Sequence, residues 1–341
     1  MKVLLTGATG FIGKRFLYRL LERGVETVCM VRGSSRTDLL ERTGTRFVFA
    51  PLEDEGSVEK VVTAERPDAV VHCAAKVVGS DEKELYRVNA EGTKNICQAC
   101  FRNKVERMVY LSSIAVVGGN NDMPLSDNMP YKARNPYGRS KLEAERIVED
   151  YRNKGMRAVV LRPCMVYGED EPHAMGRILD ALAKRRIPFL DVPEMDSKLQ
   201  LGYVGNIADA MELALYSDEC FEGTFILADK EVITLRRFLE ILYGELGVPL
   251  PFTVPSWAVG AARLIPPVRD IFGRIFRDRT YDISRAEAIL GYFPRVSTEE
   301  GLKRTVRRWK KKNCVQHGNV LKCAAPDDQP PAEGIEDIFE V

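Results

Sequence analysis

The stretch that decides the fold opens the chain, where residues 1–24 read MKVLLTGATGFIGKRFLYRLLERG. Residues 2–6 are a short apolar run typical of a strand, and the residues that follow the turn place apolar side chains at helical spacing. We expect Gly7 to adopt a positive φ, Gly10 to let the backbone approach a pyrophosphate, and Gly13 to let the helix lie close to the sheet. Since a helix N-terminus offers free N–H groups to phosphates, the stretch predicts a dinucleotide site; the alternative is a tight structural bend.

Short apolar runs alternate with helical patterns through the first half of the chain. The predicted strands lie at 2–7, 27–32, 46–50, 69–74, 107–113 and 157–163, and the predicted helices lie near 11–24, 57–65, 82–103 and 137–154. Strands that are apolar throughout are typical of a sheet covered on both faces. The pattern therefore predicts an α/β fold, a Rossmann-type doubly wound parallel sheet with a smaller C-terminal α/β substrate lobe.

Three parts of the chain differ in pattern. Strands and helices alternate regularly over 1–168, where we expect the dinucleotide-binding Rossmann domain with the catalytic residues. Helical patterns then mix with short strands and prolines, so 169–312 is predicted to be mostly a substrate-binding lobe. From about residue 313 the periodicity ends and proline and acidic residues become frequent, which indicates a flexible acidic tail over 313–341.

Charge and composition argue against several classes of function. The 341 residues carry 50 Lys and Arg against 49 Asp and Glu, so bulk charge gives no reason to expect a nucleic-acid partner. A strand pattern from residue 2 and the lack of a long apolar run predict a cytoplasmic protein. The eight cysteines are scattered through apolar segments, which is typical of free thiols. His72, His173 and His317 form no recognisable metal pattern, and we expect no metal.

The end of the second predicted strand indicates which dinucleotide binds. An NAD site usually has an acidic residue there, against the ribose hydroxyls. This sequence reads VCMVRGSSR over 28–36, with Arg32 at that position and Ser34, Ser35 and Arg36 beyond it. Cations and hydroxyls suit a 2′-phosphate, so NADP(H) is favoured over NAD(H). The alternative is that these residues are solvated loop charges.

A second group of polar residues lies in NPYGRSKLEAE, residues 135–145. Tyr137 and Lys141 are four residues apart and therefore share one face of a helix. A nearby cation makes a phenol a competent proton donor and acceptor at neutral pH. Ser113 follows the fifth predicted strand, at the edge where ligands of such sheets bind, and could hydrogen-bond a substrate oxygen. Each residue alone would most often be structural, but their combination with the glycine turn predicts an active site.

Taken together, these segments resemble the extended short-chain dehydrogenase/reductase superfamily, of the NAD-dependent epimerase/dehydratase clan, over about residues 1–312. The matching motifs are TGATGFIG at 6–13, HCAA at 72–75, YGRSK at 137–141 and LRPCMVYG at 161–168. The resemblance implies that Tyr137 is the general acid/base, that Lys141 lowers its pKa and holds the nicotinamide ribose, and that Ser113 positions the substrate oxygen.

The resemblance and the glycine turn together imply a set of cofactor contacts. Two positions depart from the family pattern: Pro51 stands where an aspartate often lies near the adenine, and VVGG at 116–119 replaces a V-Y-G motif. Asn89, in YRVNAEGT, is expected to have a structural or supporting role. The full predicted set is Gly7, Thr9, Gly10, Phe11, Ile12, Gly13, Arg32, Ser35, Arg36, Leu52, Ala74, Ala75, Asn89, Tyr137, Lys141, Pro163 and Val166.

The segment RPCMVYG bears on the choice of branch. In sugar-nucleotide enzymes it resembles R-Y-F-N-V-Y-G, whose asparagine contacts the diphosphate, and here Met165 stands in that place. A thioether cannot replace that amide but suits an apolar pocket. We expect Met165 and Tyr203 to contact the substrate. The stretches TLRRFLEIL and YDISRAEAILGYFPRVSTEEGLKRT look most like the 3β-hydroxysteroid dehydrogenase-like and sterol-4-carboxylate dehydrogenase-like branch.

Residues 256–277 have a basic amphipathic character. Apolar residues between Trp257 and Phe276 are interspersed with arginines at 263, 269, 274 and 277. Such a segment could lie on a membrane surface or admit a lipid-like substrate. The alternative is a lobe helix packed on its own core with its arginines in solvent. The sequence thus leaves open peripheral membrane contact, and it also leaves open a homodimer.

The sequence as a whole predicts an NAD(P)-dependent oxidoreductase. Its reaction would transfer hydride between the cofactor and a secondary alcohol or ketone of a hydrophobic substrate of sterol-, acyl- or flavonol-like type. One alternative is a sugar-nucleotide epimerase or dehydratase that retains its NAD. The other is a non-catalytic dinucleotide-binding scaffold, which would have no need of the Ser113, Tyr137 and Lys141 combination.

Overall fold

A computed structural model describes residues 1–77, 81–184, 189–190, 192–221, 223–250, 253–262, 264, 273, 275–317 and 320–323. Contacts within the chain divide it into two compact units. Unit 1 comprises Met1–Cys164, Val204–Ala228 and Tyr281–Pro294, and unit 2 comprises Met165–Tyr203, Asp229–Thr280 and Arg295–Val341. The chain therefore passes repeatedly from one unit to the other, and the boundary predicted at residue 168 stays a prediction.

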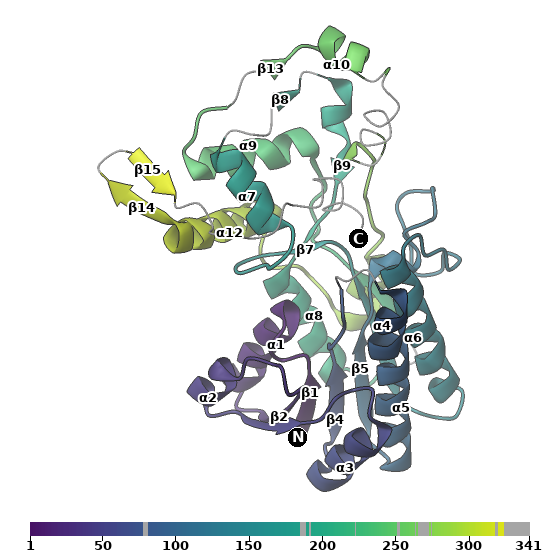
Figure 1. The fold of residues 1–341 in the computed structure, drawn as a ribbon. Coiled ribbons are helices and arrows are strands. Elements are labelled where there is room, and N and C mark those ends of the chain that lie inside the picture. The colour runs from purple at the N-terminus through teal and green to yellow at the C-terminus, as the bar shows by residue number, and fades with distance from the viewer. Residues whose placement is uncertain are drawn as a thin grey trace. The chain divides into compact units, whose positions relative to one another are not determined.

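Unit 1 is built on a seven-stranded sheet with the strand order β11-β6-β5-β4-β1-β2-β3. Figure 1 labels β1, β2, β4 and β5 of this sheet. The strands are β1 (Lys2–Thr6), β2 (Glu26–Val31), β3 (Arg46–Phe49), β4 (Ala69–His72), β5 (Arg107–Leu111), β6 (Ala158–Pro163) and β11 (Thr224–Leu227). All neighbouring strands pair in parallel, and the order reverses at β1, which lies between β2 and β4. This is the doubly wound Rossmann arrangement, so the predicted fold class is confirmed.

Helices cover both faces of this sheet. They are α1 (Phe11–Glu22), α2 (Asp38–Thr43), α3 (Glu55–Glu65), α4 (Glu82–Tyr86), the π-helical segment η1 (Arg87–Glu91), α5 (Gly92–Arg102), the 3₁₀ turn η2 (Ile114–Val116), α6 (Pro136–Arg152), α8 (Val204–Tyr216) and the π-helical segment η4 (Ala286–Leu290). Helices α3, α5 and α6 pack side by side, and α1 packs against α8 (Figure 1). Because side chains alternate along a strand, Leu4 joins the core beneath α3, α5 and α6, whereas its neighbours Val3 and Leu5 point to the other face.

Some elements of unit 1 are absent from the sequence-based prediction. Strand β11 lies at the edge of the sheet and pairs with β6, and the short helix α2 follows β2. The predicted helix at 82–103 consists of α4, η1 and α5 in succession. The π-helical turn in its middle is of the kind that often marks a functional position, and it carries Asn89.

Unit 2 contains shorter elements. They are β7 (Val166–Tyr167), α7 (Met175–Ala183), β8 (Phe189–Leu190), the 3₁₀ turn η3 (Pro193–Asp196), β9 (Lys198–Leu199), β10 (Gly202–Tyr203), β12 (Ile233–Thr234), α9 (Leu235–Leu246), β13 (Thr253–Val254), α10 (Ser256–Ala262), α12 (Thr298–Asn313), β14 (Cys314–His317) and β15 (Val320–Cys323). Helix α9 packs against α12, and each buries an apolar stripe.

The start of the predicted C-terminal tail is a hairpin. Strands β14 and β15 pair antiparallel and follow α12 directly. Residues 324–341 lie outside the described residues. The flexible acidic tail therefore stays a prediction.

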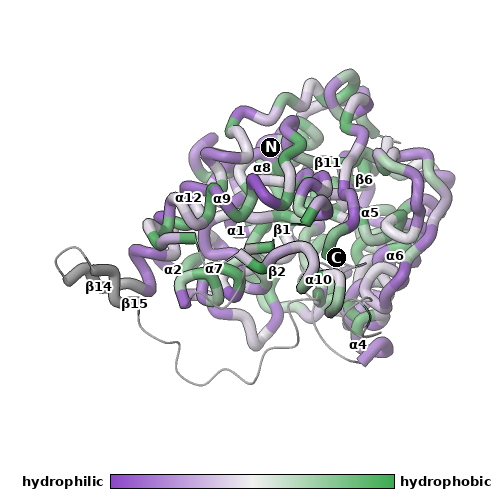
Figure 2. Tube along the Cα trace, turned by 90° about the horizontal axis from the view of Figure 1, so that it is seen from above, coloured by the Kyte–Doolittle hydropathy of each residue, from purple (hydrophilic) through white to green (hydrophobic). Residues whose placement is uncertain are grey.

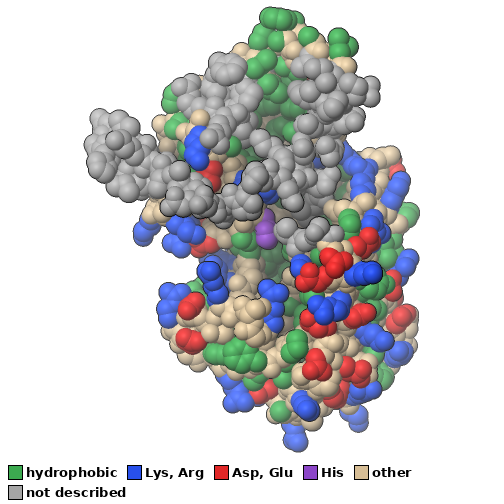
Figure 3. Space-filling model, viewed as in Figure 1, with side chains coloured by type: hydrophobic (Ala, Val, Ile, Leu, Met, Phe, Trp, Pro, Cys, Tyr) green, Lys and Arg blue, Asp and Glu red, His purple; other side chains and the backbone are tan. Residues whose placement is uncertain are grey.

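The described surface carries mixed charge and an apolar area around α10. Figure 3 shows basic and acidic side chains intermixed over unit 1 and hydrophobic side chains gathered near α10. In this area Trp257 is 77% exposed and Leu264 is 84% exposed. Of the predicted amphipathic segment, positions 263, 265–272 and 274 lie outside the described residues. No helix within the described part of the chain is long and apolar enough to cross a membrane.

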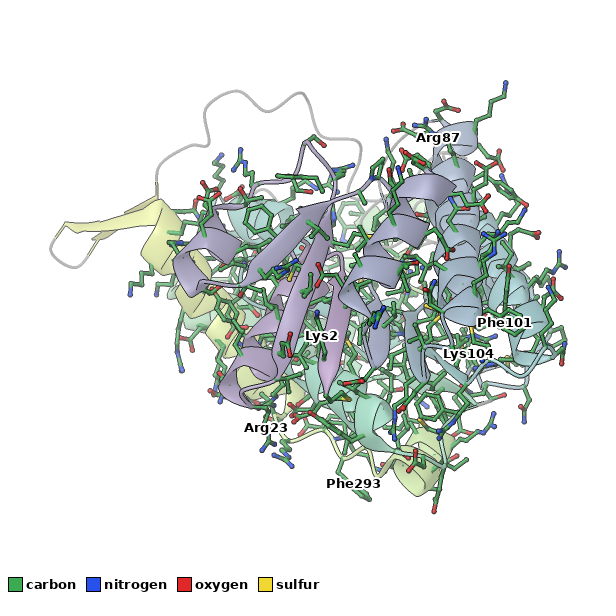
Figure 4. The ribbon with its side chains drawn as sticks, turned by 90° about the horizontal axis from the view of Figure 1, so that it is seen from below. Lys2, Arg23, Arg87, Phe101, Lys104 and Phe293 are labelled. Atoms are coloured by element: carbon green, nitrogen blue, oxygen red, sulfur yellow. The ribbon has the colours of Figure 1, made fainter. Side chains whose placement is uncertain are left out.

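The two ends of the sheet in unit 1 differ in character. At the amino end, Lys2 Nζ lies 2.8 Å from a Glu65 carboxylate oxygen, and Arg23 Nε lies 2.7 Å from one of Glu212 (Figure 4). These ion pairs join β1 to α3 and the end of α1 to α8. The apolar strands themselves lie inside the unit, among the hydrophobic segments in Figure 2. The predicted site residues of unit 1 lie toward the carboxyl end of the strands.

Candidate active site

The glycine turn between β1 and α1 is a close contact between backbone segments. Gly7 has a φ of +77°, in the left-handed region that favours glycine. A Cβ atom on Gly7 would lie 2.6 Å from the Ala74 nitrogen, and one on Gly13 would collide with the Gly7 carbonyl oxygen. The positive φ predicted for Gly7 is confirmed, and the absence of a side chain at Gly13 lets the first turn of α1 approach the loop before it.

The start of α1 has N–H groups that the helix itself does not satisfy. Gly10 is the N-cap residue, no side chain caps it, and the first turn carries no acidic residue. Its amide donates to the Gly7 carbonyl at 2.9 Å, which closes the turn. Thr9, Phe11 and Ile12 around it are half-buried. Unsatisfied N–H groups and the positive end of the helix dipole suit an anion.

The loop after β2 presents the two arginines predicted to select the cofactor. Arg32 and Arg36 are exposed, and Ser35 is half-buried. The Ser35 amide donates to the Arg32 carbonyl at 2.9 Å, which forms a turn. Within the described residues, neither arginine forms an ion pair with an acidic side chain. Both guanidinium groups can therefore receive an added phosphate.

A buried row of hydrogen-bonded residues, which was not predicted from the sequence, holds β4 against β1. Thr6 Oγ1 and His72 Nδ1 share a hydrogen bond of 2.7 Å, and Thr6 Oγ1 also accepts from the Ala74 amide at 3.2 Å. His72 Nε2 lies 3.1 Å from Thr93 Oγ1. Burial lowers the pKa of His72 to about 3, so the ring is neutral. This row fixes the backbone that faces the glycine turn; its only sequence signal is the position of His72 in the HCAA motif.

Asn89 is buried, and both the oxygen and the nitrogen of its side-chain amide form hydrogen bonds. Its Oδ1 accepts from the Lys76 amide at 2.8 Å, and its Nδ2 donates to the Lys76 carbonyl and to Ser140 Oγ at 2.9 Å each. Ser140 Oγ in turn donates to the Tyr137 carbonyl at 2.8 Å. Asn89 thus fastens the segment after β4 to the first turn of α6. A contact with a cofactor stays a prediction.

Ser113 follows the carboxyl end of β5, and its side chain lies near the Tyr137 phenol. Ser113 Oγ also accepts from the Ala115 amide at 3.2 Å. Tyr137 lies in the first turn of α6, which Asn135 caps by accepting from the Gly138 amide at 2.7 Å. Burial raises the pKa of Tyr137 to about 12, while the polar side chain of Ser113 opposes the rise. The phenol therefore carries its proton at neutral pH.

Lys141 is buried one turn farther along α6. Its Nζ donates to the Leu111 carbonyl at 2.8 Å and lies 4.4 Å from the centre of the Tyr110 ring. Burial lowers the pKa of Lys141 to about 7, while the Glu145 carboxylate opposes the fall. In this structure the ammonium is bound to β5, and the expected lowering of the Tyr137 pKa by Lys141 stays a prediction.

The remaining predicted residues lie in different places. The Leu52 carbonyl accepts from Asn95 Nδ2 at 2.8 Å, and Pro163 is buried at the end of β6. Val166, Met165 and Tyr203 belong to unit 2, where Tyr203 is fully buried and its hydroxyl donates to the Glu169 carboxylate at 2.9 Å. The contacts predicted for these residues with cofactor or substrate stay predictions.

The arrangement in unit 1 combines an anion-binding turn, a protonated phenol and a buried ammonium. These features suit proton transfer to or from an oxygen beside a bound dinucleotide. In the described part of the chain, no group of His, Cys, Asp and Glu side chains is arranged to hold a metal.

Comparison with known proteins agrees with a dinucleotide-binding site in unit 1. A model of the family described as NAD dependent epimerase/dehydratase matches residues 3–224, a span that holds the glycine turn, Ser113, Tyr137 and Lys141. The 2-alkyl-3-oxoalkanoate reductase of Shewanella oneidensis is 30% identical over 332 residues, which cover 88% of this chain and 84% of that protein.

Two further similarities extend over most of the chain. The 4-hydroxy-2-methyl-3-oxo-4-farnesyl-3,4-dihydroquinoline-1-oxide ketoreductase of Stigmatella aurantiaca is 25% identical over 321 residues, which cover 89% of this chain and 95% of that protein. The crystal structure of UDP-glucose 4-epimerase from Thermus thermophilus in complex with NAD has a TM-score of 0.72 and 26% identity, and the match covers 91% of this chain and 99% of the other.

Proposed function

Because the chain belongs to the NAD dependent epimerase/dehydratase family, we propose that it interconverts a secondary alcohol and a ketone on a hydrophobic substrate with NADP(H). The chain is an enzyme of the extended short-chain dehydrogenase/reductase type, a class that uses a nicotinamide cofactor. What we propose beyond this class is that the substrate is hydrophobic and that the cofactor is NADP(H). The steroid-dehydrogenase-like branch stays a prediction.

The observation that carries the proposal is that the Ser113 side chain lies near the Tyr137 phenol at the carboxyl end of β5. Both hydroxyls can reach one substrate oxygen: Ser113 donates a hydrogen bond to it, and Tyr137 gives it a proton when a ketone is reduced or takes one when an alcohol is oxidised. Lys141 supplies positive charge from the same helix, which stabilises the phenolate that Tyr137 becomes after it gives up its proton.

The cofactor pocket of the proposal lies at the glycine turn. A side chain at Gly7 or Gly13 would collide with backbone atoms, so glycine keeps the turn tight. The N-terminus of α1, which has no side-chain cap and no acidic residue in its first turn, suits a pyrophosphate. Arg32 and Arg36 would hold a 2′-phosphate, because both are exposed and form no ion pair within the described residues. When bound, the nicotinamide supplies or accepts the hydride.

Two observations support a hydrophobic substrate. Met165 replaces the asparagine that the sugar-nucleotide pattern has in this segment, and a thioether suits apolar surroundings. The names of two relatives describe reductases, one of an alkyl-substituted oxoalkanoate and one of a farnesyl-bearing quinoline oxide.

A sugar-nucleotide epimerase that retains NAD is the second candidate. The likeness to the UDP-glucose 4-epimerase bound to NAD favours it. The two candidates differ in whether cofactor is consumed, because an epimerase returns the hydride to its substrate within one cycle and a reductase does not.

The experiment begins with the nucleotide that the purified protein retains, identified by mass spectrometry after denaturation. Turnover is then measured with 2-alkyl-3-oxo acids, steroid ketones and UDP-glucose, with the absorbance of reduced nicotinamide as the signal. We expect NADPH-dependent reduction of an apolar ketone, and a fall in kcat of about 10²-fold or more in Tyr137→Phe. Conversion of UDP-glucose without net cofactor consumption would identify an epimerase instead. Nucleotide binding without turnover of any of these compounds would favour the scaffold.

We also propose peripheral membrane contact through the area around α10, because Trp257 and Leu264 expose most of their apolar surface to solvent. The homodimer stays a prediction, which sedimentation of the purified protein tests.

A further inference from the structure

Glu145 is a buried carboxylate one turn beyond Lys141 on α6. Its side chain is 2% exposed, and that of its partner Arg162 on β6 is 3% exposed. Arg162 Nε donates to Glu145 Oε1 at 3.0 Å, and Arg162 Nη2 donates to Oε2 at 2.7 Å. The Ser112 hydroxyl donates to the same Oε1. A carboxylate this far from solvent is costly unless its oxygens are satisfied, and here each oxygen accepts at least one hydrogen bond.

Arg162 is itself fixed by further contacts. Its Nη1 donates to the Asp127 carbonyl at 3.0 Å, and its guanidinium lies 5.3 Å from the centre of the Tyr131 ring. Asp127 Oδ1 accepts from the Ile226 amide of β11 at 2.6 Å. The pair of Glu145 and Arg162 therefore ties α6 to the edge strands of the sheet.

Glu145 also contacts the segment at the end of β5 that leads to Ser113. Lys141 Nζ binds the Leu111 carbonyl, and Glu145 binds the hydroxyl of the next residue, Ser112. Helix α6 thus holds the end of β5 at two successive residues, immediately before Ser113. A shift of α6 along β5 would break both contacts, so they fix the distance between Ser113 and the Tyr137 that α6 carries.

The Glu145 carboxylate, one helical turn beyond Lys141, also acts on the ammonium through its charge and favours the protonated form. Other titratable groups near the ammonium are neutral at pH 7, because burial raises the pKa of the cysteine thiol to about 12, that of Tyr137 to about 12 and that of Tyr110 well above its ordinary value, and it lowers that of the histidine to about 3. These neutral groups are His72 and Cys73 at the end of β4, Tyr110 on β5 and Tyr137 on α6. Arg162 and Tyr131 face Glu145 from its other side.

We propose that Glu145 is a positioning residue that keeps the buried Lys141 ammonium charged and holds the end of β5 in register with α6. The inference rests on the proposed function in taking Tyr137 and Lys141 as the working residues. Its first consequence, the charge of Lys141, is independent of any substrate. An uncharged Lys141 would bind a nicotinamide ribose less well and would not stabilise a phenolate at Tyr137.

Three variants test the proposal. Glu145→Gln keeps the shape and one acceptor but removes the charge. Glu149→Gln is the matched control, because Glu149 lies one turn farther on the same helix, pairs with Arg152 at 2.9 Å and is 55% exposed. Glu145→Gln/Arg162→Gln removes both buried charges. It replaces the single variant in the measurements if the unpaired buried arginine prevents Glu145→Gln from folding.

The first measurement is the NMR titration of Lys141 in protein labelled with ¹³C at the lysine ε-carbon, its signal assigned by its loss in Lys141→Met. We expect the Lys141 midpoint to fall by about one pH unit or more in Glu145→Gln, since an opposite charge at close range favours the ammonium. The double variant should fall by less, because it also removes the cation Arg162. Glu149→Gln should titrate like the parent. An unchanged midpoint in both Glu145 variants would overturn the proposal.

The second measurement is the pH profile of kcat/KM. The limb on which activity falls as Lys141 loses its proton should move to lower pH in Glu145→Gln by the same shift that NMR reports. A uniform loss of activity with an unmoved limb would show a structural role only and would contradict the proposal. The proposed function fails separately: retained turnover in Tyr137→Phe would remove Tyr137 from the chemistry and leave the Lys141 titration standing.

Discussion

Replacing Gly7 by alanine tests whether backbone contact shapes the turn proposed to bind the cofactor. The new Cβ would lie 2.6 Å from the nitrogen and 2.8 Å from the Cα of Ala74, at a φ of +77°. The left-handed conformation costs an alanine about 1–2 kcal/mol. The overlap adds about 1–3 kcal/mol, because the atoms it meets are backbone and cannot rotate away. We therefore expect Gly7→Ala to lower the free energy of unfolding by about 2–5 kcal/mol.

Gly24→Ala is the matched control. Gly24 follows α1 with a φ of +66°, and no heavy atom of the described residues lies within 4 Å of the position its Cβ would take. Alanine there has the conformational cost alone, about 1–2 kcal/mol. Urea denaturation followed by circular dichroism measures both variants, with the slope m checked for a change in the unfolded state.

The same two variants are then titrated with NADPH. Gly7→Ala should weaken binding at least about tenfold, the equivalent of about 1.4 kcal/mol, because the turn must move away from its present contact. Gly24→Ala should bind like the parent. An equal loss of stability in the two variants would refute the argument from the contact between Gly7 and Ala74. Unchanged NADPH affinity in Gly7→Ala would remove the turn from the cofactor site.

Three further predictions concern charge and surface. Burial lowers the pKa of Lys141 from its ordinary 10.5 to about 7, so between those pH values the unfolded chain binds a proton that the folded protein does not, and stability from this group rises with pH. Lys141→Met should therefore raise Tm more at pH 6 than at pH 9, and a difference that does not vary with pH would contradict this. Arg32→Asp should shift the ratio of kcat/KM values from NADP toward NAD, since it exchanges a phosphate partner for a hydroxyl acceptor; an unchanged ratio would show that the loop does not select the cofactor. Trp257→Ser with Leu264→Ser should lower sedimentation with anionic vesicles at an unchanged Tm, because both side chains are exposed, and equal sedimentation would exclude this area as the contact.

The sheet could be predicted from the sequence because of what parallel pairing demands. Strands buried on both faces must be largely apolar, and β1, β2, β4, β5 and β6 show this in composition, whereas β3 at the edge of the sheet is only partly buried. Strand β11 is an apolar run of four residues in a part of the chain where helical patterns predominate, and its place in the sheet depends on pairing with β6, far back in the chain. The break of the long helix at η1 depends in the same way on the contacts of Asn89 with Lys76 and Ser140.

Within the site, the sequence indicates residue types better than partners. The spacing of Tyr137 and Lys141 predicts a shared helical face, but the hydrogen bond from Lys141 to Leu111 depends on how α6 packs on β5. Glu145 and Arg162 are charged residues of types that are mostly exposed, so composition gives no reason to expect both of them buried. Their role follows from packing, which no local pattern encodes.

The division of unit 1 into three chain segments has a consequence for biosynthesis. On a ribosome, β6 emerges well before β11, which covers its free edge, and α1 emerges long before its packing partner α8. Until the later segments arrive, the nascent chain presents an unpaired parallel strand beside apolar helix surface, a combination that invites association with other chains. A fragment ending at residue 168 would contain Ser113, Tyr137 and Lys141 and still lack the strand and helix that close its fold. The complete set of contacts within unit 1 can therefore form only after the segment ending at Pro294 has been synthesised.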